Sequence, residues 1–176
     1  INQQSDATFF IDYMKLRGVR PGIEYRYTPE KTTKGVFNAS YLDDKSLNQQ
    51  FYKVNWTHNQ VLPGNIALGG KLDLVGNNNP DKTFNDNTVE RTRRNTDSFL
   101  SANKTWNNSS LYLLTRYRSN TVDQTIDDKF ALLPQAVFRT QKSTIGNSPV
   151  YFNQESSFSA FYSNLDPTRT TSNYTT

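Results

Sequence analysis

Apolar and polar residues alternate with a period of two in segment after segment of this chain, and no other feature constrains the fold as strongly. In the first such segment one parity is apolar and the other is polar. The apolar residues are Ala7, Phe9, Ile11 and Tyr13, and the polar ones are Asp6, Thr8 and Asp12. Because successive side chains of a β-strand point to opposite faces of the sheet, the pattern predicts strands with one apolar and one polar face.

The alternation recurs over residues 19–28, 34–41, 52–57 and 66–74, with short polar turns between the segments. It resumes over 98–106, 111–118, 136–141 and 151–162. Two polar stretches without periodicity interrupt it, a long loop at about 76–95 and a second at about 120–130. The sequence therefore predicts an all-β chain of about nine antiparallel strands, most of them roughly nine to eleven residues long.

Composition supports a sheet with two different faces. Hydrophobic residues supply 34% of the chain, against roughly 45–50% in ordinary globular domains. Charged residues, at 20%, do not make up the difference, whereas Asn, Gln, Ser and Thr are abundant. The 10 Tyr, 11 Phe and 2 Trp argue against disorder, since disordered chains are poor in aromatic residues. An antiparallel sheet with one apolar and one wet face accounts for this balance.

Strand length separates two architectures that share the alternation. Strands of soluble proteins average about 5–6 residues, whereas crossing a bilayer takes about 9–11. Short turns on one side and long polar loops on the other are typical of outer-membrane barrels, with the turns in the periplasm. Several apolar faces end in an aromatic residue, as interfacial girdles do: Tyr13, Tyr25, Tyr27, Tyr41 and Trp56. The pattern favours part of an antiparallel transmembrane β-barrel, and a soluble β-sandwich is the alternative.

Several function classes are disfavoured. The chain has no Cys, hence no disulfide, thiolate metal site or cysteine nucleophile. The net charge of +4 comes from dispersed basic residues, which argues against a nucleic-acid partner. No run approaches ~18 continuous apolar residues, as a transmembrane helix requires. The chain opens with neither Met nor a signal peptide, so we expect it to be an internal part of a longer protein.

Candidate catalytic and metal-binding residues are few. The sole histidine, His58, lacks triad or metal partners at recognisable spacing, so a structural or interfacial role is expected. The pairs Asp43-Asp44 and Asp127-Asp128 lack the ligand pattern of a calcium loop and are expected to be solvated loop ends. We therefore expect no metal, no cofactor and no enzyme activity. Three arginines of the long loop either contact phosphates or keep the loop clear of the membrane: Arg91, Arg93 and Arg94.

A series of motifs resembles the start of the barrel in the LptD family, the outer-membrane lipopolysaccharide-assembly proteins also called organic solvent tolerance proteins. The motifs are Ser5-Asp6-Ala7-Thr8, Tyr13-Met14, Arg17-Gly18, Glu24-Tyr25-Arg26-Tyr27, Ser40-Tyr41-Leu42-Asp43-Asp44-Lys45, Trp56-Thr57-His58, Leu133-Pro134-Gln135 and Pro149-Val150-Tyr151-Phe152. Their order and spacing agree with the family from about residue 5 to residue 163. The chain departs from it at Ile11, where many members have proline, and around Phe84-Asn85-Asp86.

The resemblance implies a location in the outer membrane of a Gram-negative bacterium. Residues 1–176 would be the first strands of a larger barrel, without the periplasmic jellyroll that precedes them in the family. The function implied is insertion of lipopolysaccharide into the outer leaflet. Its sugars would pass through a polar lumen while its acyl chains leave through a lateral seam at the first strand. The implied partners are lipopolysaccharide, the plug lipoprotein LptE, membrane lipids and, through the missing jellyroll, the periplasmic bridge protein LptA.

The resemblance also assigns residues. The lateral gate strand would contain Ala7, Thr8, Phe9, Ile11 and Tyr13. Pro21 would weaken the neighbouring strand, because proline removes a ladder donor; alternatively, Pro21 is merely the first residue of a strand that begins late. The polar residues expected to face the lumen are Arg20, Glu24, Arg26, Arg116 and Arg118. These arginines either contact sugar phosphates or pair with acids such as Glu24 and Asp12.

Two other functions stay open at this point. One is a passive porin or a small adhesin-type barrel, in which solutes move along the axis or partners bind the surface. The other is a barrel enzyme acting on membrane lipids. The enzyme would need a serine presented to a histidine, and His58 is the one histidine available.

Overall fold

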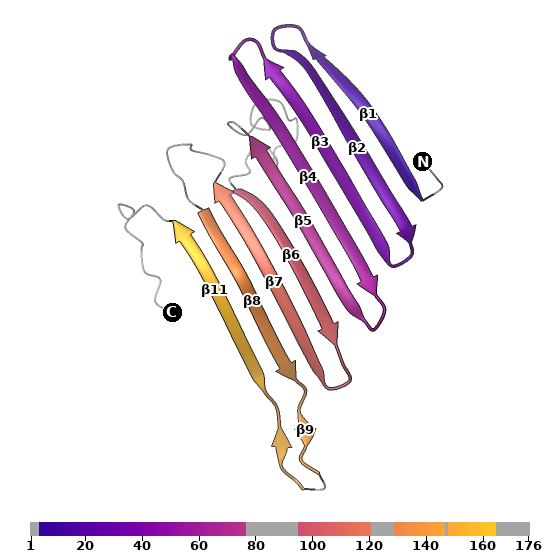
Figure 1. Ribbon diagram of the computed structural model, residues 1–176, viewed down its shortest axis with the longest axis vertical. Helices are drawn as coiled ribbons and strands as arrows, with labels where there is room; N and C mark the ends of the chain where they lie inside the picture. Colours follow the sequence, from indigo (N-terminus) through magenta and orange to yellow (C-terminus); the bar gives the residue numbers. More distant parts are fainter. Residues whose placement is uncertain (1–3, 77–94, 121–128, 147, 165–176) are drawn as a thin grey trace.

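Nine long strands form one antiparallel sheet in the computed structural model, which describes residues 4–76, 95–120, 129–146 and 148–164 (Figure 1). Each strand pairs with its neighbours in chain order. The strands are β1 (Ser5–Met14), β2 (Gly18–Glu30), β3 (Thr33–Asp44), β4 (Gln49–Leu62), β5 (Ile66–Gly76), β6 (Asn95–Thr105), β7 (Ser109–Asn120), β8 (Lys129–Thr140) and β11 (Glu155–Asn164). In the chain, a short hairpin of β9 (Ser143–Thr144) and β10 (Tyr151–Phe152) connects β8 to β11. The predicted all-β class and the nine antiparallel strands are confirmed.

Within the described ranges, no helix is long and apolar enough to cross a membrane.

Short turns occur at both ends of the sheet: residues 15–17 join β1 to β2 and residues 45–48 join β3 to β4 at one end, and three further short turns lie at the other. These three join β2 to β3, β4 to β5 and β6 to β7 at the lower end in Figure 1, where the β9–β10 hairpin also lies. In the β4–β5 turn Gly64 and Asn65 have positive φ values of 80° and 59°, a conformation that these two residue types adopt most readily. The ends of β5 and β7 lie at the opposite end of the sheet. The predicted long loop at 76–95, with Arg91, Arg93 and Arg94, lies almost wholly outside the described residues, as does Asp127-Asp128.

The C-terminal strands differ from the sequence prediction. β8 begins at Lys129 rather than near Ala136, and the predicted strand over 151–162 is divided between β10 and β11. The division comes at Gln154, whose carbonyl accepts a hydrogen bond from the Thr140 amide at 2.8 Å. From there β11 resumes pairing with β8 in the main sheet. The prediction of one continuous last strand was therefore wrong.

A bulge in β8 breaks the alternation where the chain contains proline. Leu132 and Gln135 are three residues apart in β8. The residues paired with them are only two apart in β7 (Arg116 and Leu114) and in β11 (Phe161 and Ser159), so β8 contains one extra residue. Pro134 lies in this extra-residue segment, which fits the rule that proline inside a sheet is found at bulges or edges. The bulge therefore explains how the proline of the Leu-Pro-Gln motif is accommodated inside β8.

The register separates the side chains into an apolar face and a polar face. One cross-strand row contains Tyr25, Phe37, Trp56 and Leu72, and the adjacent row contains Glu24, Asn38, Asn55 and Asp73. Neighbouring rows point to opposite faces. The apolar face is open: the exposed fractions of Phe9, Ile11 and Tyr13 are 75%, 74% and 75%. A β-sandwich would cover such a face with a second sheet, and the described residues form no second large sheet, so the structure does not support the sandwich alternative.

Aromatic rings lie over glycines of the neighbouring strand at three places. Phe10 pairs with Gly22, Tyr27 with Gly35 and Tyr52 with Gly76. A Cβ atom added at any of these glycines would overlap the ring. Each ring therefore covers backbone that glycine leaves bare, an arrangement that stabilises glycine within sheets.

The two faces predict different tolerance to charge. If the apolar face contacts lipid, Ile23→Arg in the middle of β2 should cost about 2–4 kcal/mol of folding free energy. Asn38→Arg, one row away on the polar face, should cost far less. The comparison is the yield of folded protein in the outer membrane for the two variants of the full-length protein. Equal yields would contradict a lipid-facing apolar side.

Candidate functional site

The polar face carries ion pairs that join neighbouring strands. Arg26 Nη2 lies 2.7 Å from Asp6 Oδ2, and Arg20 Nη2 lies 2.6 Å from Asp12 Oδ2, so β1 is tied to β2 near both of its ends. Glu24 Oε1 lies 3.4 Å from Arg26 Nε. Half-exposed pairs of this kind each contribute little, typically about 0–1 kcal/mol. Their clearer consequence is that the arginine side chains are held in fixed positions on this face.

The same arrangement recurs on β6 and β7. Asp97 Oδ1 lies 3.1 Å from the Nε atoms of both Arg116 and Arg118. The five residues predicted to face a lumen all lie on the polar side: Arg20, Glu24, Arg26, Arg116 and Arg118. Each of the four arginines pairs with an acid of an adjacent strand.

Asp73 is a buried acid that links three strands. Its side chain is 1% exposed. Asn55 of β4 donates to Oδ1 at 2.7 Å, and the backbone amide of Asp97 in β6 donates to Oδ2 at 3.3 Å. The hydroxyl of Ser98 accepts from the Asp73 amide at 2.9 Å. These donors offset the cost of burying the carboxylate and fix the orientation of the Asn55 amide.

Asp44 is buried at the end of β3, which contradicts the expectation of a solvated loop end. Its exposed fraction is 0%. The backbone amides of Ser46 and Leu47 donate to Oδ1 at 2.9 and 3.0 Å, and Arg17 Nη1 donates to Oδ2 at 3.3 Å. The carboxylate therefore closes the β3–β4 turn and connects it to the β1–β2 turn. Asp43, next to it, is exposed as expected.

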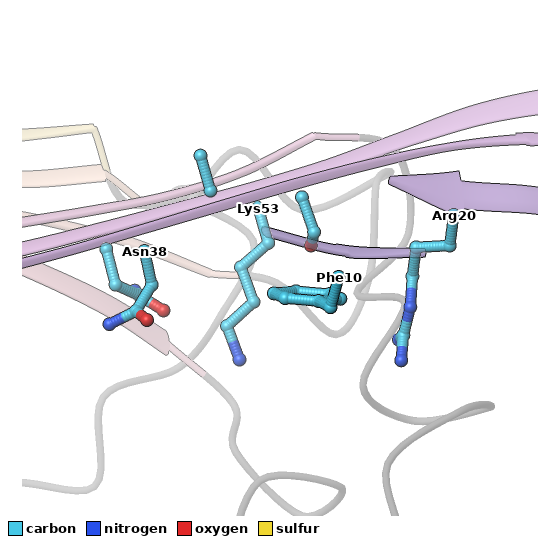
Figure 2. A pocket seen from close by; sticks show the side chains of 7 residues that line it. Phe10, Arg20, Asn38 and Lys53 are labelled. Atoms are coloured by element: carbon cyan, nitrogen blue, oxygen red, sulfur yellow. The ribbon is translucent and has the colours of Figure 1, made fainter. Parts of the chain in front are cut away.

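A hollow of about 270 Å³ opens on the polar face over β1 to β4. In Figure 2 the Phe10 ring lies nearly parallel to the strands, between the side chains of Lys53 and Arg20. The cross-strand row runs Phe10, Gly22, Ser40, Lys53. Small residues in the middle of this row leave the space that the larger side chains surround. The residues lining it are Phe10, Arg20, Asn38, Ala39, Ser40, Lys53 and Asn55.

Sequence reasoning did not identify Phe10 or Lys53 as site residues. Phe10 occupies the polar parity of β1, where its neighbours on the same face are Thr8 and Asp12. An aromatic residue at a polar position, opposite a glycine on the next strand, is the signal that marks it. That signal becomes usable when the β1–β2 register is known.

The predicted gate residues lie on β1, an edge strand of the described sheet with β2 as its partner. Four of the five point to the apolar face: Ala7, Phe9, Ile11 and Tyr13. Thr8 points to the polar face. β11 forms the opposite edge, and the two edges do not pair, so the described sheet is open.

β2 begins at Gly18, three residues before Pro21, so the alternative in which a late strand begins at Pro21 is wrong. The Thr28 amide donates to the Gln4 carbonyl beyond the end of β1, and the β1–β2 register is regular from there. Backbone amides alternate in direction along a strand, so Pro21, seven residues from Thr28, has its nitrogen toward β3. The β2–β3 ladder ends at Gly22, whereas Pro21 stays paired with Ile11. The missing donor therefore affects the β3 side.

An apolar hollow of about 440 Å³ accompanies this loosened ladder on the other face. Phe9, Pro21 and Ile23 line it together with side chains of β3 and β4. Nearer the β2–β3 turn, Tyr27 Oη lies 2.8 Å from His58 Nδ1 and accepts from Trp56 Nε1 at 3.1 Å. This aromatic group gives His58 a structural place on the apolar face. The described residues contain no group of three His, Cys, Asp or Glu side chains able to hold a metal ion.

A long-stranded antiparallel sheet with one exposed apolar face and one ion-paired polar face is the architecture of an outer-membrane barrel wall. No family model matches the chain. It is similar to the LPS-assembly protein LptD of Shewanella frigidimarina (strain NCIMB 400), with 32% identity over 89 residues. The aligned stretch is 49% of this chain and 11% of that protein, so the chain matches about a tenth of the relative's length.

Two adjacent aspartates give a matched test of the buried turn. Asp44→Ala removes the acceptor for two backbone amides and for Arg17, so it should lower the free energy of unfolding by about 1–3 kcal/mol. Asp43→Ala, at the exposed neighbour, should change it by about 0.5 kcal/mol or less. Urea unfolding of the full-length protein in phospholipid vesicles measures both. Equal effects would mean that the Asp44 hydrogen bonds do not hold the turn.

Proposed function

We propose that this chain forms part of the wall of an outer-membrane β-barrel that delivers lipopolysaccharide to the outer leaflet. The observation that carries the proposal is the open, two-faced sheet, and the similarity to LptD supports it. The apolar face would contact lipid, and the polar face would line the lumen. Phosphorylated sugars are costly to transfer into hydrocarbon, so a polar lumen is the path that such a headgroup requires.

The first strand is the proposed exit. β1 is tied to β2 by a regular register and by the Asp6–Arg26 and Asp12–Arg20 pairs. Its other edge has no partner among the described strands. Backbone groups at such an edge cannot remain unpaired in a bilayer, so in the complete barrel this edge would pair with the final strand. We propose that this seam, rather than the β1–β2 ladder, opens to release acyl chains.

The proposal includes location and partners. The barrel would lie in the outer membrane of a Gram-negative bacterium and contact membrane lipids. LptE would plug the lumen, and LptA would deliver lipopolysaccharide through a jellyroll that precedes the barrel. No covalent step is involved, so the protein would act without a cofactor and not as an enzyme.

Neither alternative function is favoured by the arrangement of the described strands. A small closed barrel would pair β1 with β11, and these strands lie at opposite edges of the sheet. A lipid-modifying enzyme would need His58 beside a serine. The two ring nitrogens of His58 instead contact Tyr27 at 2.8 Å and Gln60 at 3.4 Å.

Locking the proposed seam tests the function directly. The variant carries Thr8→Cys and a second cysteine at the facing position of the final strand. A disulfide between the two should stop lipopolysaccharide from reaching the cell surface. Reductant should restore delivery, because it cleaves the engineered disulfide. The measurement is surface lipopolysaccharide with and without reductant, with barrel assembly checked in parallel. Delivery at the unlocked rate by the locked protein would overturn lateral release at β1.

Pro21→Ala provides the comparison for the lock. The substitution adds a backbone donor facing β3, worth about 0.5–1.5 kcal/mol, and leaves the outer edge of β1 unchanged. We therefore expect the variant to be slightly more stable and to deliver lipopolysaccharide at nearly the parental rate. A loss of delivery as large as that of the locked protein would instead place the moving ladder between β2 and β3.

A further inference from the structure

We propose that one end of the sheet, the hairpin end, binds anionic phospholipids of the periplasmic leaflet, whose phosphates contact Lys104 and Lys142. The hairpin end is the end with the β4–β5 turn (63–65), the β6–β7 turn (106–108) and the β9–β10 hairpin (Figure 1). The inference rests on the part of the proposed function that puts the apolar face in a bilayer. It adds the class of lipid bound there and the residues that recognise its headgroup.

The connections between strands indicate which leaflet the hairpin end meets. The longest connection between adjacent strands of the sheet, residues 77–94, joins β5 to β6 at the opposite end. The β4–β5 and β6–β7 connections at the hairpin end are short turns. Long loops of outer-membrane barrels are extracellular and short turns are periplasmic. The hairpin end therefore lies at the inner leaflet, which in a Gram-negative outer membrane consists of phospholipids.

Lys104 is a cation at the border of the apolar face. Its cross-strand row is otherwise apolar and contains Leu62, Ile66, Leu111 and Phe138. The pair of Leu62 and Ile66 is the last before the β4–β5 turn, so this row is the outermost one in β4 and β5. The Lys104 ammonium lies 5.7 Å from the centroid of the Trp106 ring and donates to the Gly64 carbonyl. An ammonium has three donors, so this contact leaves two for a ligand.

Lys142 is a second cation at the same end, between β8 and the hairpin. Its ammonium lies 4.7 Å from the centroid of the Tyr151 ring in β10. A cation over an aromatic ring is held in place by the ring quadrupole but keeps its charge. In the part of the chain that the structure describes, neither Lys104 nor Lys142 forms an ion pair. Both lysines are therefore positioned by rings and not neutralised by acids.

The hairpin end carries a net positive charge from β4 to β11. Residues 59–70, 101–115 and 134–159 form it, and their charged residues are Lys104, Arg139, Lys142 and Glu155. Arg139 Nη2 lies 2.9 Å from Glu155 Oε1, so the acid is already paired. Glu30 also lies at this end, but on β2, four strands from Lys104, or about 19 Å at the usual strand spacing. Two positive charges remain to attract an anionic headgroup.

Exposed apolar side chains accompany these charges. On the hairpin they are at least half exposed: Ile145, Val150, Tyr151 and Phe152. Aromatic rings and lysine stems are suited to the zone where the hydrocarbon of a bilayer meets its headgroups. There the apolar side chains contact acyl chains while the lysine ammonium groups reach phosphate. A zwitterionic headgroup carries a cation of its own, so an anionic phospholipid gains more from the two lysines.

The opposite end of the sheet supplies a matched control. Lys15 of the β1–β2 turn and Lys45 of the β3–β4 turn line a hollow of about 300 Å³. Asp43 lines the same hollow, so an acid accompanies these two lysines. Replacing both with glutamine removes as much charge as replacing Lys104 and Lys142, but from the other end of the same strands.

The test measures the local concentration of lipid at the hairpin end of the full-length protein. Asn107→Cys in the β6–β7 turn carries a fluorophore, and the protein is reconstituted in phosphatidylcholine vesicles. These contain a small fraction of nitroxide-labelled phosphatidylglycerol or nitroxide-labelled phosphatidylcholine. Phosphatidylglycerol should be enriched about threefold to fivefold over phosphatidylcholine, as measured by quenching. Lys104→Gln with Lys142→Gln should remove this excess, whereas Lys15→Gln with Lys45→Gln should leave most of it.

Equal quenching by the two lipids would overturn the site, and so would equal effects of the two pairs of lysine substitutions. If the variant of Lys104 and Lys142 fails to assemble, salt provides a second measurement on the parental lysines. About 1 M NaCl should abolish the excess, because it shortens the Debye length to about 3 Å. An excess that survives this salt would reject recognition by the lysines.

The outcome is separable from that of the proposed function. Loss of delivery on locking the seam, in a protein without lipid preference at the hairpin end, would reject the phospholipid site alone. A preference for phosphatidylglycerol in a protein whose locked seam still delivers lipopolysaccharide would reject the proposed exit instead.

Discussion

The cross-strand register is the constraint on which the rest of this structure depends. Side chains alternate with a period of two, so a slip of one residue between two strands would move every side chain to the opposite face. The row containing Trp56 and the row containing Asn55 are one residue apart, and they carry the apolar and polar characters of the sheet. Tight turns limit such slips, as in the β4–β5 turn with Gly64 and Asn65 at positive φ.

Buried acids reinforce the register and connect it to the hollow. Asp73 accepts hydrogen bonds from β4 and β6 while itself belonging to β5. A shift of either neighbour would leave a buried carboxylate without its donors, which is far more costly than losing an exposed ion pair. Because Asp73 also holds Asn55, and Asp12 holds Arg20, the side chains around Phe10 are positioned by the same contacts that align the strands.

The two edges of β2 have different strengths, and this bears on the proposed seam. On the β1 side the ladder is regular and has ion pairs near both ends. On the β3 side it ends at Gly22, where Pro21 has no donor to offer. β1 and β2 would therefore move together as a pair, so the weakness introduced by proline does not separate the first strand from the second.

The sequence by itself determined the all-β class, the positions of most strands, the two faces and the polar side on which Arg20, Arg26, Arg116 and Arg118 lie. These features follow from local alternation, which is visible within a single strand. The tertiary structure alone decided the burial of Asp44, the hairpin before β11, the side of β2 weakened by Pro21 and the hollow at Phe10. Each of these depends on which residue of a neighbouring strand stands opposite. That pairing joins residues distant along the chain, such as Asn55 and Asp73, and local alternation contains no information about it.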